Sequence, residues 1–289
     1  MTLPSTIGIF GLGLIGTALS KRLIAAGVDL CGYDPDPAGM ERLKQLGGRA
    51  VTAAQVWQSP CVISAVFDTA QLADLAAGSP QDAGCTIISF STCDPAQMPE
   101  IAKAVSARGN TLIEAPISGT SADLAAGDAI LLVAGDRAVA DGLEPLFNAV
   151  SRAHYHVGDV GNGNRAKLAI NLTLGLTRAA IAEGFVFAKS VGLKPDDFLT
   201  LALDSAAASK AMASKGPKMA TGDFAPLGRI AQSGKDFALI LEQAALAGQG
   251  LPMAEQYLDL IADNIAQGEG DLDNAAILLA IARAKPSKA

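Results

Sequence analysis

The chain has 289 residues, of which 50% are hydrophobic, 18% charged and 4% aromatic, and its formal net charge is −7. This balance is typical of a globular protein with room for two domains, and it excludes a disordered chain. Nucleic-acid binding uses a basic stripe, often with stacking rings, and an acidic chain poor in aromatic residues offers neither. We therefore expect no nucleic-acid partner.

The sequence shows no targeting or membrane segment. Residues 1–5 lack a basic segment followed by an apolar run and a small-residue cleavage site, so we expect no signal peptide. The most leucine-rich stretch is interrupted by Lys167, Arg178 and Glu183, so we expect nothing to span a membrane. These features predict a cytoplasmic protein.

Four cysteines are present, Cys31, Cys61, Cys85 and Cys93. They form no C-x-x-C pair and fall mostly in apolar, strand-like runs, so we interpret them as reduced core residues. His154 and His156 alternate on a predicted strand with no cysteine or carboxylate cluster nearby. We therefore expect no metal site.

A dinucleotide-binding pattern opens the chain. The strand Thr6–Phe10 leads into a glycine-rich turn and a helix to Ala26, and a second strand, Val28–Tyr33, ends at Asp34. In G-x-G-x-x-G the first glycine makes the tight turn, the second lets a pyrophosphate approach, and the third lets helix and strand pack closely. The predicted cofactor-binding residues of this turn are Gly11, Leu12, Gly13, Leu14, Ile15 and Gly16. Asp34 can accept hydrogen bonds from the adenosine ribose.

Strands and helices alternate as far as residue 157. The further predicted strands are Cys61–Val66, Thr86–Phe90, Thr111–Glu114, Ile130–Ala134 and Ala153–Val157, with helices near 69–76, 95–107 and 139–150. Such alternation demands a parallel sheet with helices on both faces, and ligands bind at the carboxyl ends of its strands. Those ends carry Val66 and Phe67, then Ser91 and Thr92, and then the segment 114–120.

The pattern changes from Gly163 onward. One long helix is predicted at 165–191, followed by helices near 195–203, 207–219, 230–247, 252–265 and 274–283, and no strand pattern appears. We therefore predict an α/β protein with an N-terminal Rossmann domain, a doubly wound sheet, at 1–162. An all-α domain follows at 163–289, joined through a long interdomain helix at about 164–192.

Lys167 and Asn171 begin the long helix four residues apart, which places both on one face. Alone, such a pair is typical of a solvated surface. Its position favours a functional site, because it lies where the α/β half gives way to the helical half and clefts tend to form at such junctions. From the residues alone, Lys235 and Asp236 fit a charged surface patch and a functional site equally well.

Four motifs in this order resemble the β-hydroxyacid dehydrogenase family, which contains 3-hydroxyisobutyrate dehydrogenase, tartronate semialdehyde reductase and short relatives of 6-phosphogluconate dehydrogenase. The motifs are Phe10–Gly16, Glu114-Ala115-Pro116-Ile117-Ser118-Gly119-Thr120, Gly161-x-Gly163-x-x-x-Lys167-x-x-x-Asn171 and Lys235-Asp236-Phe237. The resemblance covers essentially the whole chain. The four motifs together are specific, whereas any one could arise by chance.

The resemblance implies a role for each matching residue. Lys167 is implied as the catalytic acid/base and Asn171 as the residue that orients the substrate. Ser118 and the Gly119 backbone, helped by Thr120, are implied to hold a substrate carboxylate. By the same resemblance, the cofactor site is lined by Val66, Phe67, Thr92 and Lys235.

The chain departs from the family pattern at four positions. Thr120 replaces a usual second glycine, and Ser89 replaces a common aspartate. Phe67 stands where proline is usual, and Leu227 replaces an aromatic residue. None of these changes removes a catalytic group, but Thr120 and Leu227 could reshape the substrate pocket.

The sequence thus predicts an NAD-dependent oxidoreductase that transfers hydride between nicotinamide and a small, carboxylate-bearing hydroxyacid or its semialdehyde or keto partner. We expect NAD rather than NADP, because the Asp34 carboxylate would repel a 2′-phosphate. The alternatives are an imine reductase of similar architecture, disfavoured by Lys167, and a dinucleotide-binding protein without catalysis. The apolar helical half predicts a homodimer or homotetramer.

Overall fold

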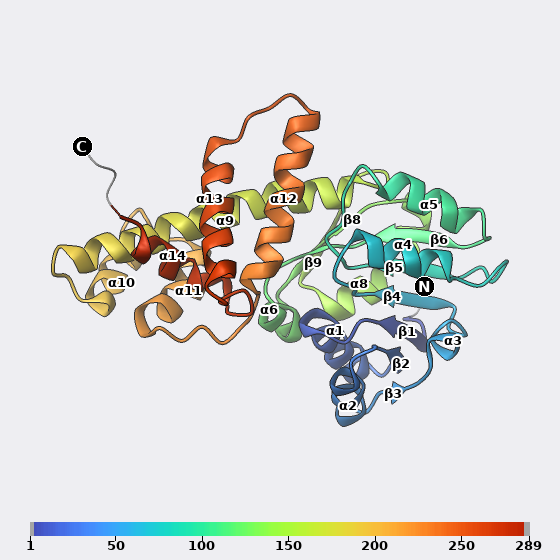
Figure 1. Cartoon of the computed structure of the whole chain (residues 1–289). Helices are drawn as coiled ribbons and strands as arrows, with labels where there is room; N and C mark the ends of the chain where they lie inside the picture. The colour runs from blue at the N-terminus through green and yellow to red at the C-terminus, as the bar shows by residue number, and fades with distance from the viewer. Residues whose placement is uncertain (1–2, 286–289) are drawn as a thin grey trace. The chain divides into compact units, whose positions relative to one another are not determined.

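The computed structural model describes residues 3–285, and its contacts divide the chain into two units, Met1–Lys167 and Leu168–Ala289 (Figure 1). The division falls inside one continuous helix, α9 (Asn162–Ser190). The predicted domain boundary, between residues 162 and 163, lies at the start of the same helix. We refer to the two parts as unit 1 and unit 2.

Unit 1 is built on a six-stranded parallel sheet in the order β3-β2-β1-β4-β5-β6. Its strands are β1 (Thr6–Phe10), β2 (Asp29–Tyr33), β3 (Arg49–Ala50), β4 (Cys61–Ser64), β5 (Thr86–Ser89) and β6 (Thr111–Glu114). The order reverses between β1 and β4, which is the point where doubly wound sheets bind ligands at the carboxyl ends of their strands. The predicted Rossmann fold is confirmed.

Alternating side chains along each strand build a core on both faces of this sheet. Ile7 and Ile63 lie in one buried cluster, while Val62 and Ile87 lie in another with Met98 of α5. The helices of this region are α1 (Leu14–Ala25), α2 (Pro37–Gln45), α3 (Ala53–Val56), α4 (Thr69–Ala77) and α5 (Met98–Ser106). Helices α4 and α5 pack side by side (Figure 1).

A second sheet follows β6, with β7 (Ile117–Ser118) antiparallel to β8 (Ile130–Val133) and β9 (Ala153–His156) parallel to β8. Its helices are α6 (Ser121–Ala126), α7 (Arg137–Gly142) and α8 (Glu144–Val150). The single helix predicted near 139–150 is wrong. Two helices occur instead, because Pro145 starts a new helix at its first turn.

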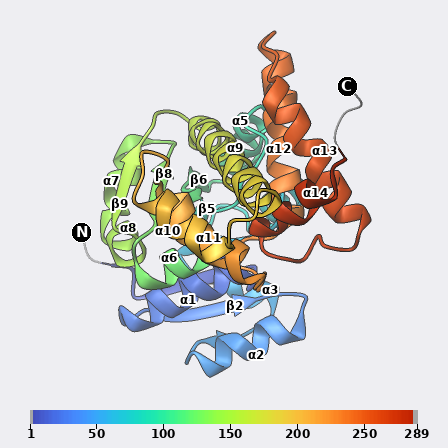
Figure 2. The same ribbon diagram turned by 90° about the vertical axis from the view of Figure 1, so that its left-hand side faces the viewer.

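The described residues of unit 2 form helices joined by loops, with one isolated β-bridge between Arg229 and Asp273. After α9 come α10 (Pro195–Leu203), α11 (Lys210–Thr221), α12 (Ile230–Leu246), α13 (Pro252–Ala266), the 3₁₀ turn η1 (Asn274–Ala276) and α14 (Ile277–Arg283). Helices α12 and α13 run side by side (Figure 1; Figure 2). The rings of Phe237 and Tyr257 pack in a tilted arrangement with centroids 4.5 Å apart. A Cβ at Gly175 would lie 2.4 Å from the Phe237 ring, so α9 needs glycine at that contact.

Helix α9 is long and apolar enough to cross a membrane by length and composition alone, with 22% of its most apolar window buried. Its apolar residues also form part of the unit 2 core, through Leu168, Ile181 and Phe185. Arg178 donates a hydrogen bond to the Tyr257 hydroxyl at 3.1 Å. These contacts pack part of α9 into the core of unit 2.

Candidate active site

Each glycine of the turn between β1 and α1 meets a different steric demand. Gly11 has φ +87°, and a Cβ there would lie 2.5 Å from the Ala65 carbonyl oxygen. A Cβ at Gly16 would lie 1.8 Å from the Gly11 carbonyl oxygen, so helix and turn touch there. A Cβ at Gly13 would meet no heavy atom within 4 Å. Gly11 and Gly16 therefore fit turn and packing roles, and Gly13 leaves space for a ligand to approach the backbone.

The N-terminus of α1 fits a pyrophosphate. The N-cap residue is Gly13, which has no side chain to cap the helix, and the first turn of α1 contains no acidic residue. Its backbone N–H groups and the positive end of the helix dipole therefore remain suited to an anion. Leu14, at the start of this helix, is 40% exposed.

Asp34 fastens the end of β2 to the glycine turn. One carboxylate oxygen accepts a hydrogen bond from the Leu12 N–H at 2.6 Å, and the other accepts from the Asp36 N–H at 2.8 Å. Arg42 of α2 donates to the Leu12 carbonyl oxygen at 3.0 Å and lies 3.8 Å from the Asp36 carboxylate. The guanidinium group therefore lies against the glycine turn to which Asp34 is also hydrogen-bonded.

The carboxyl ends of β4 and β5 are tied together. The Ser91 hydroxyl donates to the Val66 carbonyl oxygen at 2.7 Å, and Thr92 follows Ser91 directly. The Phe67 N–H donates to the Gln71 side chain at 2.9 Å, which fixes the loop while the Phe67 ring stays 48% exposed. Val66, Phe67 and Thr92 thus all lie at the sheet edge where the sequence predicts the cofactor.

The segment 118–120 leaves β7 and enters α6. Gly119 has φ +145°, and a Cβ there would lie 3.2 Å from the Ala129 side chain, so glycine is required. Thr120 is the N-cap of α6 in a capping box: its hydroxyl donates to the Asp123 carboxylate at 2.7 Å and accepts from the Asp123 N–H. The Thr120 hydroxyl therefore has a structural task, and its contact with substrate stays a prediction. Ser118 is half-buried on β7.

In unit 2, Asp236 collects the polar groups of α9 and α12. Its carboxylate accepts from the Asn171 side-chain amide at 2.7 Å, pairs with the Lys235 ammonium at 3.3 Å and accepts from Gln232 at 3.3 Å. Asp236 is 5% exposed. Sequence reasoning gave a role to Lys235 but none to Asp236. The signal was its position in the Lys-Asp-Phe motif.

The described residues contain no group of three or more histidine, cysteine or acidic side chains suited to a metal ion. The four cysteines are buried free thiols. Burial raises the pKa of the Cys61 thiol to about 12 and that of the Cys85 thiol to about 11, which disfavours the thiolate. These two thiols are therefore poor nucleophiles.

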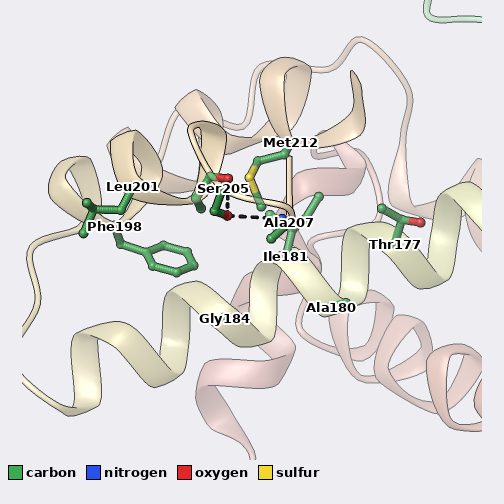
Figure 3. A pocket seen from close by; sticks show the side chains of 10 residues that line it. Thr177, Ala180, Ile181, Gly184, Phe198, Leu201, Ser205, Ala207 and Met212 are labelled. Atoms are coloured by element: carbon green, nitrogen blue, oxygen red, sulfur yellow. Dashed lines mark hydrogen bonds between the residues drawn. The ribbon is translucent and has the colours of Figure 1, made fainter. Parts of the chain in front are cut away.

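A cavity of about 470 Å³ lies in unit 2 between α9 and the helices α10 and α11 (Figure 3). Its lining is apolar, with Ile181, Phe198, Leu201 and Met212 facing the space, and no lining residue is charged. It offers no charged side chain and no carboxyl, amine or imidazole group, and its polar side chains are the hydroxyls of Thr177 and Ser205. We therefore do not place the reaction there.

Two family models cover the chain in succession. The NAD-binding domain of 6-phosphogluconate dehydrogenase matches residues 6–158, and the NAD-binding domain of NADP-dependent 3-hydroxyisobutyrate dehydrogenase matches residues 161–281. The chain belongs to the β-hydroxyacid dehydrogenase family. It is a pyridine-nucleotide-dependent oxidoreductase of hydroxyacids, in agreement with the four motifs in its sequence.

Individual β-hydroxyacid dehydrogenases support this assignment. The chain is 29% identical to 2-hydroxy-3-oxopropionate reductase of Escherichia coli over 285 residues, covering 95% of this chain and 96% of the relative. A crystal structure of 3-hydroxyisobutyrate dehydrogenase from Salmonella typhimurium has a TM-score of 0.86 and 25% identity, covering 95% of this chain and 99% of that one. An imine reductase from Pseudomonas sp. shares the fold, with a TM-score of 0.67 and 22% identity over 97% and 100% of the two chains.

Proposed function

We propose that this enzyme transfers hydride between NAD and a small hydroxyacid, or its semialdehyde or keto partner, with Lys167 as the general acid/base. The observation that carries the proposal is the pairing on α9. Lys167 lies one helical turn before Asn171, whose amide is held by the buried Asp236. A proton-transfer group and an oriented polar group thus share one helical face.

When bound, the pyridine nucleotide supplies the hydride acceptor or donor. In oxidation, Lys167 takes the proton of the substrate hydroxyl. In reduction, it gives a proton to the developing alkoxide. A lysine does this near neutral pH only where its surroundings disfavour the ammonium form.

Three groups are proposed to bind the substrate carboxylate and place its hydroxyl beside Lys167. Ser118 supplies a hydroxyl donor and Gly119 a backbone N–H. Asn171 supplies the second N–H of its amide, because the carboxylate of Asp236 can only accept a hydrogen bond and so engages the first. Charge-assisted hydrogen bonds of this kind anchor a carboxylate without a metal.

The carboxylate requirement tests this proposal. A panel of hydroxyacids, followed by NADH absorbance, should contain a substrate whose methyl ester is turned over about 10²-fold less efficiently, because the uncharged ester cannot accept the charge-assisted hydrogen bonds that the three donors make to a carboxylate. Ser118→Ala should narrow that difference. Equal efficiency on acid and ester would contradict the anion site and favour a neutral carbonyl or imine substrate.

We propose NAD as the preferred cofactor, by at least about tenfold in kcat/KM, equivalent to about 1.4 kcal/mol. The proposal is supported by Asp34, whose carboxylate ends β2 and would repel a 2′-phosphate. Arg42 is the cation nearby, so Asp34→Asn should raise activity with NADP, and adding Arg42→Ala should reverse the gain. Equal use of both cofactors by the wild type would refute the preference.

We also propose that the enzyme is a homo-oligomer in which a second copy covers the apolar surface of α9 and α10. Phe187 lies on α9, Val191 directly follows that helix and Leu201 lies on α10; the three are 66%, 58% and 63% exposed in the single chain. Apolar side chains that gather in an exposed patch are typical of an interface. Light scattering should show more than one chain in the wild type and a smaller assembly in Leu201→Asp. An unchanged assembly in that variant would place the interface elsewhere.

A further inference from the structure

A fully buried polar pair joins β6 to the start of α9 within unit 1. Glu114 is the last residue of β6, Asn164 is the third residue of α9, and both are 0% exposed. One carboxylate oxygen of Glu114 accepts from the Asn164 side-chain amide, and the other accepts from the Gly161 N–H at 2.5 Å. These partners lie 50 and 47 residues away in sequence.

The Asn164 amide also reaches the loop after β5. Its oxygen accepts from the Cys93 N–H at 2.7 Å, and Cys93 directly follows Thr92, a predicted cofactor contact. The amide orientation is chemically fixed, because a carboxylate only accepts and a backbone N–H only donates. Asn164 therefore bridges Glu114 and the loop after β5, which we call the cofactor loop because it carries Thr92.

The first turn of α9 has no room to shift against these elements. A Cβ at Gly163 would lie 2.9 Å from the Leu132 carbonyl oxygen and 3.0 Å from the Glu114 Cβ. Gly161 has φ +97°, and a Cβ there would lie 3.0 Å from the Pro95 carbonyl oxygen. The helix start is thus held between the strands β6 and β8 and the loop after β5.

We propose that Glu114 and Asn164 are positioning residues that align Lys167 with the cofactor loop and with segment 118–120, which is proposed to bind the substrate carboxylate. Lys167 lies three residues beyond Asn164, a rise of about 4.5 Å along the helix, so the direction of the first turn determines where its ammonium group points. Glu114 also begins the segment that carries Ser118, and its backbone is bridged to Ala134. The inference rests on the proposed role of Lys167.

Glu114 and Asn164 position the helix start through their hydrogen bonds and not through the volume of their side chains. Glutamine in place of Glu114 keeps the size and one acceptor, but it turns an N–H group toward the donor of either Asn164 or Gly161. One of the two links must then lengthen. A misplacement of about 1 Å can cost up to about 10²-fold in rate even when the altered residue touches no substrate.

The test is a double-mutant cycle in the full-length enzyme, with Glu114→Gln and Lys167→Ala made singly and together. We expect Glu114→Gln to lower kcat on the order of tenfold while the dissociation constant of NAD changes less than about twofold. In the Lys167→Ala background, Glu114→Gln should cause no further loss of kcat. Glu100→Gln, an exposed glutamate of α5, is the matched control and should leave kcat unchanged.

An equal loss from Glu114→Gln in both backgrounds would overturn the positioning role while leaving the proposed function intact. Near-normal turnover of Lys167→Ala alone would overturn both. Asn164→Ala provides a second route should Glu114→Gln fail to fold, because it removes the bridge to Cys93 and leaves the bond between Glu114 and Gly161. The same dependence on background is expected, and its absence contradicts the proposal.

Discussion

Two fully buried carboxylates fasten helix starts in this protein, Glu114 in unit 1 and Asp273 in unit 2, and their partners differ in charge. Glu114 accepts from the neutral donors of Asn164 and Gly161. Asp273 caps η1 through the Ala275 N–H and accepts twice from the Lys215 ammonium, at 2.8 and 2.9 Å.

The pKa values of the two carboxyls move in opposite directions. Burial raises the pKa of Glu114 above its ordinary value, since the hydrogen bonds from Asn164 and the backbone only partly offset it. Burial also acts to raise the pKa of Asp273, but the hydrogen bonds from Lys215 and the backbone outweigh it and leave that pKa lowered. Neutral hydrogen-bond donors thus hold the Glu114 carboxyl in place without strongly favouring its ionised form. The Lys215 ammonium group, by contrast, favours the ionised form of Asp273.

The largest expected effect is on the charged pair. Lys215→Met should cost about 3–5 kcal/mol of unfolding free energy, because it leaves the Asp273 carboxylate buried without a cation. Lys210→Met, at an exposed position of the same helix, should stay within about 0.5 kcal/mol. Chemical denaturation measures both. Similar values for the two variants would remove the contrast between the carboxylates.

The hydrogen bonds of Glu114 should cost less to disturb. Glu114→Gln is expected to lose about 1–3 kcal/mol, because one buried donor loses its acceptor while no charge is left unpaired. Glu41→Gln, at an exposed position of α2, is the control and should be near neutral. A loss for Glu114→Gln larger than that for Lys215→Met would reverse the proposed ranking.

The two carboxyls should also differ in the pH dependence of stability. A raised pKa means that the folded state binds more protons than the unfolded state. The contribution of Glu114 to the free energy of unfolding therefore falls as the pH rises from about the ordinary pKa of a glutamate through the raised pKa. A lowered pKa means the reverse, so the Asp273 contribution is present above about pH 4 and is lost as pH falls.

Denaturation from pH 3 to 7 checks this contrast. The stability difference between wild type and Glu114→Gln should shrink toward high pH, and that between wild type and Asp273→Asn should shrink toward low pH. Parallel trends in the two variants would contradict the assignment of opposite shifts.

The smallest effect on the free energy of unfolding is expected for an ion pair at the surface, where solvent surrounds both charges. Asp29 and Arg49 pair at 2.9 Å with both side chains more than half exposed. The pKa of Asp29 is lowered by the hydrogen bond from Arg49, but solvent screens the pair. Asp29→Asn should cost only about 0.2–1 kcal/mol, and less in high salt. A loss as large as that of Lys215→Met would mean that burial does not determine how much stability is lost when an ion pair is broken.

The sequence predicts most of the fold because its strongest signals are local. The glycine turn, the short apolar strands and the long helix each lie within one stretch of chain, and the structure has them at nearly the predicted positions. The elements β3, α3, β7 and α6 were missed because all four are short, and the nine-residue helix α2 was missed as well. The capping pattern of Thr120 and Asp123 could have revealed α6.

The partners of the site residues could not be predicted in the same way. Asn171 meets Asp236 across 65 residues, Glu114 meets Asn164 across 50, and Lys215 meets Asp273 across 58. Nothing in the spacing of a single sequence states that such residues touch. The predicted helix at 95–107 begins only at Met98, because Asp94 accepts from the Ala96 N–H and the Gln97 side chain and forms a turn first.

The central claim is that Lys167 transfers the proton, and the rate of hydride transfer in Lys167→Ala tests it most directly. With enzyme in excess and NADH formation followed in a single turnover, the rate should fall by roughly 10²–10⁴ relative to wild type. The dissociation constant of NAD should stay near the wild-type value, because the glycine turn and Asp34 are untouched. A near-normal rate accompanied by weakened NAD binding would instead make Lys167 a cofactor-binding residue and contradict the proposed function.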